Sequence, residues 1–240
     1  MRDLAPLIAI VGTDGSGKTT LSAAVIDLVR NYGPADTAHL GLKSGDAGRA
    51  IQRLPIIGNA IDALISRKAS QARDTRDKIP DPLTALVIFC FSLFRVRRFK
   101  RMMRKRRAGY IIVTDRYPQI DVPGFYDGPG LSAARATDRL TRWLARREYR
   151  QYAWMASFRP DLVIRLNVDL ETAFARKPDH RRESLRQKVE VTPRLTFGGA
   201  LIVDFDSKEP LETLVHKVRA TIAAQLDTMG IAICDARLAR

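Results

Sequence analysis

The chain has 240 residues, of which 45% are hydrophobic, and its formal net charge is +15 at pH 7. A chain of this length and composition can bury a substantial core, so we predict a single domain over residues 1–240. The two cysteines, Cys90 and Cys234, exclude a disulfide framework, and they lack the spacing of a zinc site. The positive charge favours anionic partners, namely nucleotides, nucleic acid or an acidic membrane surface.

The expected cellular location is the reducing cytoplasm, in keeping with the low cysteine content. The first residues lead directly into a predicted strand, which leaves no room for a signal peptide. No apolar run in the sequence is long enough to span a bilayer.

The strongest motif runs from Gly12 to Thr19 and has two glycines five residues apart, followed by Lys and Thr. This is the spacing of a phosphate-binding loop. The apolar run from Leu7 to Val11 predicts a buried strand before it, and apolar residues at helical spacing from Leu21 to Val29 predict a helix after it. In that order, the N–H groups of the loop and of the helix N-terminus point at phosphate oxygens.

The loop predicts ATP and Mg²⁺ as cofactors. Lys18 is expected to reach the β- and γ-phosphates, and the Thr19 hydroxyl to bind Mg²⁺. The expected cofactor-binding residues are Gly12, Asp14, Gly15, Ser16, Gly17, Lys18, Thr19 and Thr20.

The next segment is less informative. Thr37 to Leu42 predicts a second strand, and Lys43 after it faces either the ligand or solvent. Residues 48–77 have a mixed helical pattern without a chemical signature.

A long helix is predicted from Leu83 to Arg107, between a proline-rich start signal and Gly109. Its first half, as far as Phe94, is apolar nearly all round, which predicts deep burial. Its second half carries nine basic residues and no acidic one. Two interpretations stay open for this charge: a solvated helix end, and a docking surface for a larger anion.

The third predicted strand, Tyr110 to Thr114, ends at the triplet Asp115, Arg116 and Tyr117. Carboxyl ends of parallel strands present ligand-binding residues. Beside a phosphate loop, Asp115 can hold Mg²⁺ or accept a proton, and Arg116 can bind a phosphate through its planar guanidinium group. The alternative is a surface salt bridge.

The segment after the triplet combines a loop and a helix. Residues 123–130 are rich in Pro and Gly and predict an ordered loop, which either covers the acceptor or only connects two elements. Leu131 to Ser157 predicts a helix with six arginines.

The last third begins with a predicted strand from Leu162 to Val168 and a short helix capped by Asp169. A basic segment follows, with a lid expected at about residues 176–190. Arginines on a lid suit phosphoryl transfer because they neutralise the moving charge, whereas an exposed basic loop is the alternative. A fifth strand, Leu201 to Val203, and a helix, Leu211 to Leu226, complete the chain.

Four segments in this order resemble thymidylate kinase across nearly the whole chain. They are the phosphate loop, the triplet at 115–117, the Pro-Asp-Leu-Val run at 160–163 and the Val-Asp pair at 203–204. The resemblance implies a three-layer α/β P-loop NTPase fold, with a five-stranded parallel sheet of order 2-3-1-4-5, helices on both faces and an arginine lid.

The resemblance also implies residue roles. Asp14 would face the sugar 3′-hydroxyl of the acceptor, and Arg116 would bind the acceptor phosphate. Phe91 and Arg95 match the base-stacking Phe and its neighbouring Arg. Because Gly15 stands where some members have arginine, the lid would supply the catalytic arginine.

The sequence departs from the thymidylate kinase pattern in three places. The Arg-Glu-Pro-Gly segment after strand two is only Lys43-Ser44-Gly45, a different sequence follows the triplet, and Asn167 replaces a strand-four Asp. The donor half therefore looks retained, and the acceptor half looks rebuilt.

These observations predict an ATP-dependent phosphotransferase. The expected catalytic residues are Lys18, Asp115, Arg116, Arg181, Arg182 and Arg186, the substrate-binding residues are Asp14, Phe91, Arg95 and Arg116, and the metal ligands are Thr19 and Asp115. The default acceptor is dTMP, and another nucleotide, a sugar or a lipid-linked glycan stays open.

The charge also leaves a second hypothesis, a nucleic-acid-binding protein switched by nucleotide. Because the sequence contains no recognised nucleic-acid module, we do not expect nucleic acid as a partner. The basic half of the long helix is expected to contact anionic lipid at the inner face of the membrane, or to close a homodimer.

Overall fold

The computed structural model of the protein describes residues 4–41, 82–133 and 138–234. Five parallel strands form one sheet in the order β2-β3-β1-β4-β5. The strands are β1 (Leu7–Gly12), β2 (Ala35–Ala38), β3 (Ile111–Thr114), β4 (Leu162–Asn167) and β5 (Ile202–Asp206). The fold class predicted from the sequence is therefore confirmed as a three-layer α/β P-loop fold.

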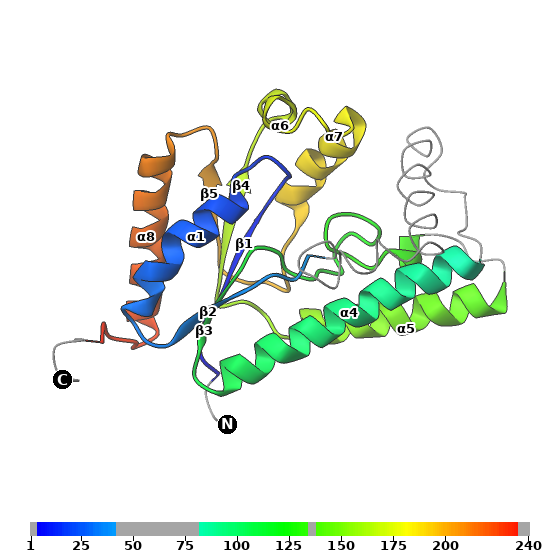
Figure 1. Ribbon diagram of the computed structural model, residues 1–240, viewed down its shortest axis with the longest axis horizontal. Helices are drawn as coiled ribbons and strands as arrows, with labels where there is room; N and C mark the ends of the chain where they lie inside the picture. The colour runs from blue at the N-terminus through cyan, green and yellow to red at the C-terminus, as the bar shows by residue number, and fades with distance from the viewer. Residues whose placement is uncertain (1–3, 42–81, 134–137, 235–240) are drawn as a thin grey trace.

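Helices cover both faces of the sheet (Figure 1). Helices α1 (Lys18–Arg30) and α8 (Leu211–Thr228) lie on one face, and α4 (Pro82–Arg107) and α5 (Arg139–Ala156) on the other. Side chains alternate between the faces of a strand, so β1 sends Ile8 into the first layer and Leu7 into the second. Because both faces are covered, β1 is a continuous apolar run.

The predicted bounds of β2 and β5 were wrong by more than one residue, whereas those of the other strands differ by one residue at one end. β2 spans Ala35–Ala38 rather than 37–42, because it pairs residue for residue with the four-residue β3 and pairing ends at Ala38↔Thr114. β5 extends to Asp206, which pairs with Asn167 of β4. Lys43, its neighbours and the pattern at 48–77 lie outside the described residues.

The helix predicted over 131–157 was also wrong as one element. A short 3₁₀ turn, η2 (Leu131–Ala133), comes first, and α5 begins after Asp138. Asp138 has an extended backbone, and its carboxylate accepts a hydrogen bond from Thr141 N at 2.7 Å, as an N-cap does. The remaining helical elements are α6 (Leu170–Arg176), α7 (Arg182–Val191) and the 3₁₀ turn η3 (Thr192–Arg194).

The prediction that the first half of α4 is deeply buried was wrong for one face. Leu83, Leu86, Leu93 and Phe94 are between 40% and 58% exposed. The helix extends beyond the sheet with α5 along one side (Figure 1), and among the described elements α5 and η2 cover one face of this half. In the parts of the chain that are described, no helix is both long and apolar enough to cross a membrane.

Some basic residues in the second half of α4 are buried, and others are exposed. Arg106 is buried and donates to Asp161 at 2.7 Å, and Lys105 pairs with Asp36 at the sheet edge. Arg95 is also buried. Five of the nine basic residues remain exposed, namely Arg97, Lys100, Arg101, Arg104 and Arg107. Part of the charge therefore holds α4 against the rest of the fold.

A buried carboxylate joins α4, α5 and η2. Glu148 of α5 is fully buried, accepts a 2.5 Å hydrogen bond from the Ser92 hydroxyl on α4, and accepts a 2.7 Å bond from Leu131 N. Burial raises the pKa of Glu148 above its usual value, although these two bonds oppose the shift.

Candidate functional site

The phosphate loop follows β1 and leads into α1 at the carboxyl edge of the sheet, as predicted. Gly12 has a φ of +153°, and a Cβ there would lie 2.5 Å from Ser16 Oγ and 2.6 Å from Leu166 O. Only glycine fits so close to β4. Gly17 is the N-cap of α1 in the left-handed region, and no side chain caps the helix. The first N–H groups of α1 are therefore available to an anion.

Lys18 is held across the loop. Its side chain is buried, and Nζ donates a 2.7 Å hydrogen bond to Thr13 O. Burial and the nearby Arg116 guanidinium lower the pKa of Lys18 to about 8, although Asp14 and Asp127 oppose the shift. A bound polyphosphate would replace the carbonyl partner and favour the charged form of Lys18.

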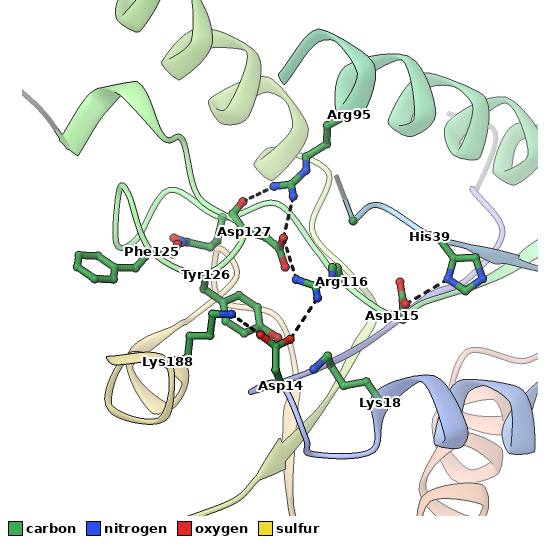
Figure 2. A network of polar contacts seen from close by, with 12 residues as sticks. Asp14, Lys18, His39, Arg95, Asp115, Arg116, Phe125, Tyr126, Asp127 and Lys188 are labelled. Carbon is green, nitrogen blue, oxygen red and sulfur yellow. Dashed lines mark hydrogen bonds and ion pairs between the residues drawn. The ribbon is translucent and has the colours of Figure 1, made fainter. Parts of the chain in front are cut away.

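Asp14, in the middle of the loop, lies beside basic side chains from distant segments, of which Figure 2 shows Arg116 and Lys188. Arg116 lies 3.3 Å from its Oδ1, and Lys188 of α7 donates to its Oδ2. His180 Nδ1, which precedes α7, lies 3.6 Å from the same oxygen. Burial alone would raise the pKa of Asp14, but Lys188, Lys18 and Arg116 hold it well below its usual range. The carboxylate therefore keeps its negative charge beside Arg116 and Lys188.

Asp115 stands directly after β3, where the sequence placed it. Its Oδ2 lies 3.1 Å from His39 Nδ1, and its Oδ1 is buried without a partner in the described chain. Because Ala38 pairs with Thr114, the residues that follow β2 and β3 lie side by side. His39 was missed, although the paired ends of two strands were the signal for it.

A buried chain of charges runs from α4 to the loop. Arg95 donates to Asp127 Oδ1 at 2.8 Å, to Asp127 O at 3.0 Å and to Tyr152 Oη at 3.0 Å. Arg116 lies 3.6 Å from the same Asp127 oxygen, and Asp127 raises the pKa of Arg116 strongly. Figure 2 shows this succession of Arg95, Asp127, Arg116, Asp14 and Lys188. Asp127 was missed from the sequence because it lies in a non-periodic loop.

The loop at 118–130 is ordered and touches the phosphate loop. The buried amide of Gln119 donates to Val122 O at 3.0 Å and to Phe125 O at 2.7 Å, and its Oε1 accepts from Val122 N at 2.8 Å. Tyr126, in the left-handed region with a φ of +48°, then reaches Gly12. The predicted ordered loop is thus present, and Tyr126 fixes its position relative to β1.

The expected lid arginines occupy different positions. Arg182 pairs with Glu171, and Arg186 lies 2.7 Å from Glu183, all on the exposed side of α6 and α7. Arg181 is exposed, with no ion pair of its guanidinium in the described chain. Arg176, at the end of α6, donates instead to Gly15 O at 3.2 Å and Ser207 O at 3.0 Å. The structure therefore brings Arg176, rather than the three named arginines, to the phosphate loop.

An open hollow of about 350 Å³ lies at the carboxyl ends of β4 and β5. It is lined by Asn167, Val168, Asp169, Asp204, Phe205, Asp206 and Lys208. Asn167 Nδ2 donates to Asp204 Oδ1 at 2.6 Å, so the Asn that replaces the family's Asp pairs with the neighbouring strand. Arg176 connects this hollow to the phosphate loop through Ser207 O.

The other predicted site residues lie in the phosphate loop, on the first turn of α1 and on α4. Thr19 and Thr20 are exposed on the first turn of α1, and Ser16 Oγ is buried without a partner in the described chain. Phe91 is half-buried on α4, one turn before Arg95.

The residues present fit a magnesium–nucleotide complex. The free oxygen of Asp115 and the hydroxyl of Thr19 are oxygen ligands of the type that Mg²⁺ takes. Within the described ranges, no three His, Cys, Asp or Glu side chains gather closely enough to hold a metal ion alone. A Mg²⁺ ion here would share its ligands with phosphate oxygens and water, as in other phosphoryl-transfer sites.

The fold and the phosphate loop place the chain in the P-loop class with a nucleotide-kinase-like architecture. It belongs to the family of the uncharacterised ATP-binding proteins YghS and YghR. It is 41% identical to YghS of Escherichia coli K12 over 221 residues, covering 92% of this chain and 93% of YghS. It is 37% identical to YghR of the same strain over 218 residues, covering 90% and 86%.

More distant comparisons agree with the fold. A probable thymidylate kinase of Archaeoglobus fulgidus is 22% identical over 226 residues, covering 92% of this chain and 96% of that protein. The deoxyadenosine kinase of M. mycoides with bound dATP superposes with a TM-score of 0.55 at 15% identity, over 90% of this chain and 99% of that one. The same kinase with dCMP and dCDP gives 0.52 at 16% identity, over 91% and 99%. No protein-family model matches the chain.

Proposed function

We propose that this protein is an ATP- and Mg²⁺-dependent phosphotransferase that moves the γ-phosphate to a small acceptor. The observation that carries the proposal is the phosphate loop itself, with Lys18 held across it and Asp14 and Asp115 beside it. The names of YghS and YghR as ATP-binding proteins support the donor. The acceptor by resemblance is dTMP, and a sugar or a lipid-linked glycan is the alternative.

In this mechanism the protein positions groups and neutralises charge. The loop N–H groups and Lys18 bind the phosphates of ATP, and the base occupies the hollow beside Asn167. Arg176 neutralises charge near Gly15, and Asp14 orients the acceptor hydroxyl. Thr19 and Asp115 would hold Mg²⁺, which would supply charge neutralisation for the phosphates of ATP.

The test is phosphoryl transfer from labelled ATP to a panel of acceptors that includes dTMP. Lys18→Ala is expected to abolish turnover while the fold remains intact. Lys217→Ala is the matched control, because Lys217 is exposed on α8 and, among the described residues, forms an ion pair with Glu209 alone. Undiminished transfer by Lys18→Ala to any accepted substrate rejects the assignment. If Lys217→Ala also loses activity, the loss in Lys18→Ala cannot be assigned to the phosphate loop.

We also propose that the exposed side of α4 and α5, the α4–α5 face, contacts anionic lipid. Its basic residues are Arg97, Lys100, Arg101, Arg104 and Arg107 on α4, and Arg139, Arg142, Arg146, Arg147 and Arg150 on α5. Glu148 is the only acidic residue in either helix, and it is buried. The exposed Trp143 and Trp154 lie among these cations, within about 6 Å of Arg147 and Lys100. Basic and aromatic side chains together suit a lipid headgroup layer.

Vesicle sedimentation tests the lipid proposal. The protein should sediment with phosphatidylserine vesicles at low salt, less at physiological salt, and not with neutral phosphatidylcholine. Reversing Arg101 and Arg104 to Glu should remove binding, whereas reversing the remote Arg30 and Lys217 should not. A protein that stays in the supernatant at low salt rejects lipid contact. In that case a dimer through this face is read from sedimentation equilibrium, and nucleic-acid binding from gel shifts at two salt concentrations.

A further inference from the structure

Two guanidinium groups on the acceptor side of the phosphate loop share one buried carboxylate (Figure 2). Arg95 and Asp127 have side chains only 3% and 4% exposed, and Arg95 lies 2.8 Å from Asp127 Oδ1. Arg116 lies 3.6 Å from the same oxygen. A kinase that accepts a monophosphate needs free cations for that phosphate, and here the cations already have an anion of the protein itself.

The pairing leaves little positive charge for a second anion. Both terminal nitrogens of Arg95 donate to Asp127 or to the Tyr152 hydroxyl, whereas its Nε is buried with no partner in the described chain. Arg116 is in contact with two carboxylates, those of Asp127 and Asp14. A phosphate dianion placed against Arg116 would stand close to both of these negative charges. In a buried setting, such like-charge contacts are costly.

Asp127 is also held in place by the fold. Residues on both sides of it are fixed, since the Tyr126 hydroxyl is bonded to Gly12 and a Cβ on Gly128 would lie 2.5 Å from Gln119 Nε2. The second carboxylate oxygen, Oδ2, has no hydrogen-bond partner in the described chain. The carboxylate therefore has capacity left for an O–H or N–H donor.

We infer that the acceptor is an unphosphorylated, hydroxyl-bearing molecule, such as a nucleoside or a sugar, rather than a nucleoside monophosphate. This inference rests on the phosphotransferase function proposed above. In the step, the acceptor oxygen bonds to the γ-phosphorus, the bond from that phosphorus to the β–γ bridging oxygen breaks, and the electron pair leaves with ADP. The hydroxyl proton passes to the transferred phosphoryl group.

Anion binding tests the inference without knowledge of the acceptor. The probe is methyl phosphate, titrated into protein whose phosphate loop is filled by a non-hydrolysable ATP analogue and Mg²⁺. The wild type should bind methyl phosphate no more tightly than it binds chloride. Asp127→Asn, which frees two cations, should bind it at least about tenfold more tightly. Asp27→Asn, an equal charge change on the exposed side of α1, should behave as the wild type does.

The outcomes separate the two proposals. If the ATP analogue does not bind, the proposed function fails. Two results overturn the inference while the proposed function stands, both in protein that binds the analogue. In the first, the wild type binds methyl phosphate much more tightly than chloride. In the second, Asp127→Asn binds methyl phosphate no more tightly than the wild type does. If Asp127→Asn does not fold, the wild-type titration decides alone.

A paired acceptor assay supplies an independent readout. Thymidine is compared with dTMP, and glucose with glucose 6-phosphate, in transfer from labelled ATP. Preferential transfer to the unphosphorylated member of a pair supports the inference. Preferential transfer to dTMP or glucose 6-phosphate overturns it and at the same time confirms phosphoryl transfer. If no member is phosphorylated, the methyl phosphate titration decides.

Discussion

The hydroxyl of Tyr126 makes two hydrogen bonds to Gly12, the first residue of the phosphate loop. It accepts from Gly12 N at 2.6 Å and donates to Gly12 O at 2.8 Å, and burial raises the pKa of Tyr126 so that the proton stays on. A loop residue more than a hundred positions away thus satisfies both backbone groups at the end of β1. The conformation of the phosphate loop depends on this contact as well as on its own glycines.

Removing that hydroxyl should therefore weaken nucleotide binding without touching the nucleotide. In Tyr126→Phe, the buried N–H and C=O of Gly12 lose their partner, which should lower the free energy of unfolding by about 1–3 kcal/mol. The measurement is chemical denaturation together with the Kd for ATP. Tyr149→Phe on the exposed side of α5 is the control. Equal stability and equal ATP affinity in Tyr126→Phe and the control would show that the contact is dispensable.

The protonation of Lys18 should make nucleotide binding depend on pH. In the free protein, burial and Arg116 lower the pKa of Lys18 to about 8, whereas bound phosphates favour its charged form. Binding therefore takes up a proton once the pH exceeds about 8, and ATP affinity should fall as the pH rises further. Isothermal titration at several pH values measures this. Lys18→Arg keeps its charge throughout, so its affinity should be flat across the same range.

The four arginines of the lid region should differ in their effect on rate. Arg176→Ala removes the contacts to Gly15 O and Ser207 O and should lower kcat/KM for ATP by about tenfold or more. Arg182→Ala and Arg186→Ala remove exposed ion pairs and should change it by less than about threefold. Arg181→Ala should fall between these. A larger loss in Arg182→Ala or Arg186→Ala than in Arg176→Ala would mean that α7 turns these side chains inward during turnover.

Glu148 should make the stability of the α4–α5 pair sensitive to pH. Because burial raises its folded-state pKa, the folded protein holds the proton to a higher pH than the unfolded chain does. Its contribution is fully present below the unfolded value of 4.5 and is lost as the pH rises through the folded pKa. Thermal denaturation across this range should show a fall in stability for the wild type. Glu148→Gln cannot lose a proton, so its stability should lack that fall, and a parallel fall in both proteins would contradict the assignment.

The sequence predicted the parts of the site that depend on local spacing. The phosphate loop and Asp115 lie where the sequence placed them because each follows directly from the end of one apolar strand. His39, Tyr126 and Asp127 act through contacts between distant segments, and residues in an irregular loop have no periodicity to mark them. They could be found only after the strand register and the path of the 118–130 loop were known.

The burial of α4 was mispredicted for a related reason. Its apolar half matches a core helix in composition, but exposure is decided by which face the sheet and α5 cover. The buried Arg95 stands inside because Asp127 and Tyr152 provide partners there, and hydrophobicity alone gives no sign of such partners.

The contacts of Asp14 affect how an acceptor can bind at the site. Its Oδ1 already contacts Arg116 and its Oδ2 contacts Lys188 and His180, so an acceptor hydroxyl that binds this carboxylate would compete with these side chains. Lys188 and His180 belong to the α7 region, and their release would free that region to move as the acceptor arrives. On the proposed function, these contacts are expected to disfavour hydrolysis of ATP, and the ATPase rate in the absence of acceptor should rise when Lys188 is replaced by Met.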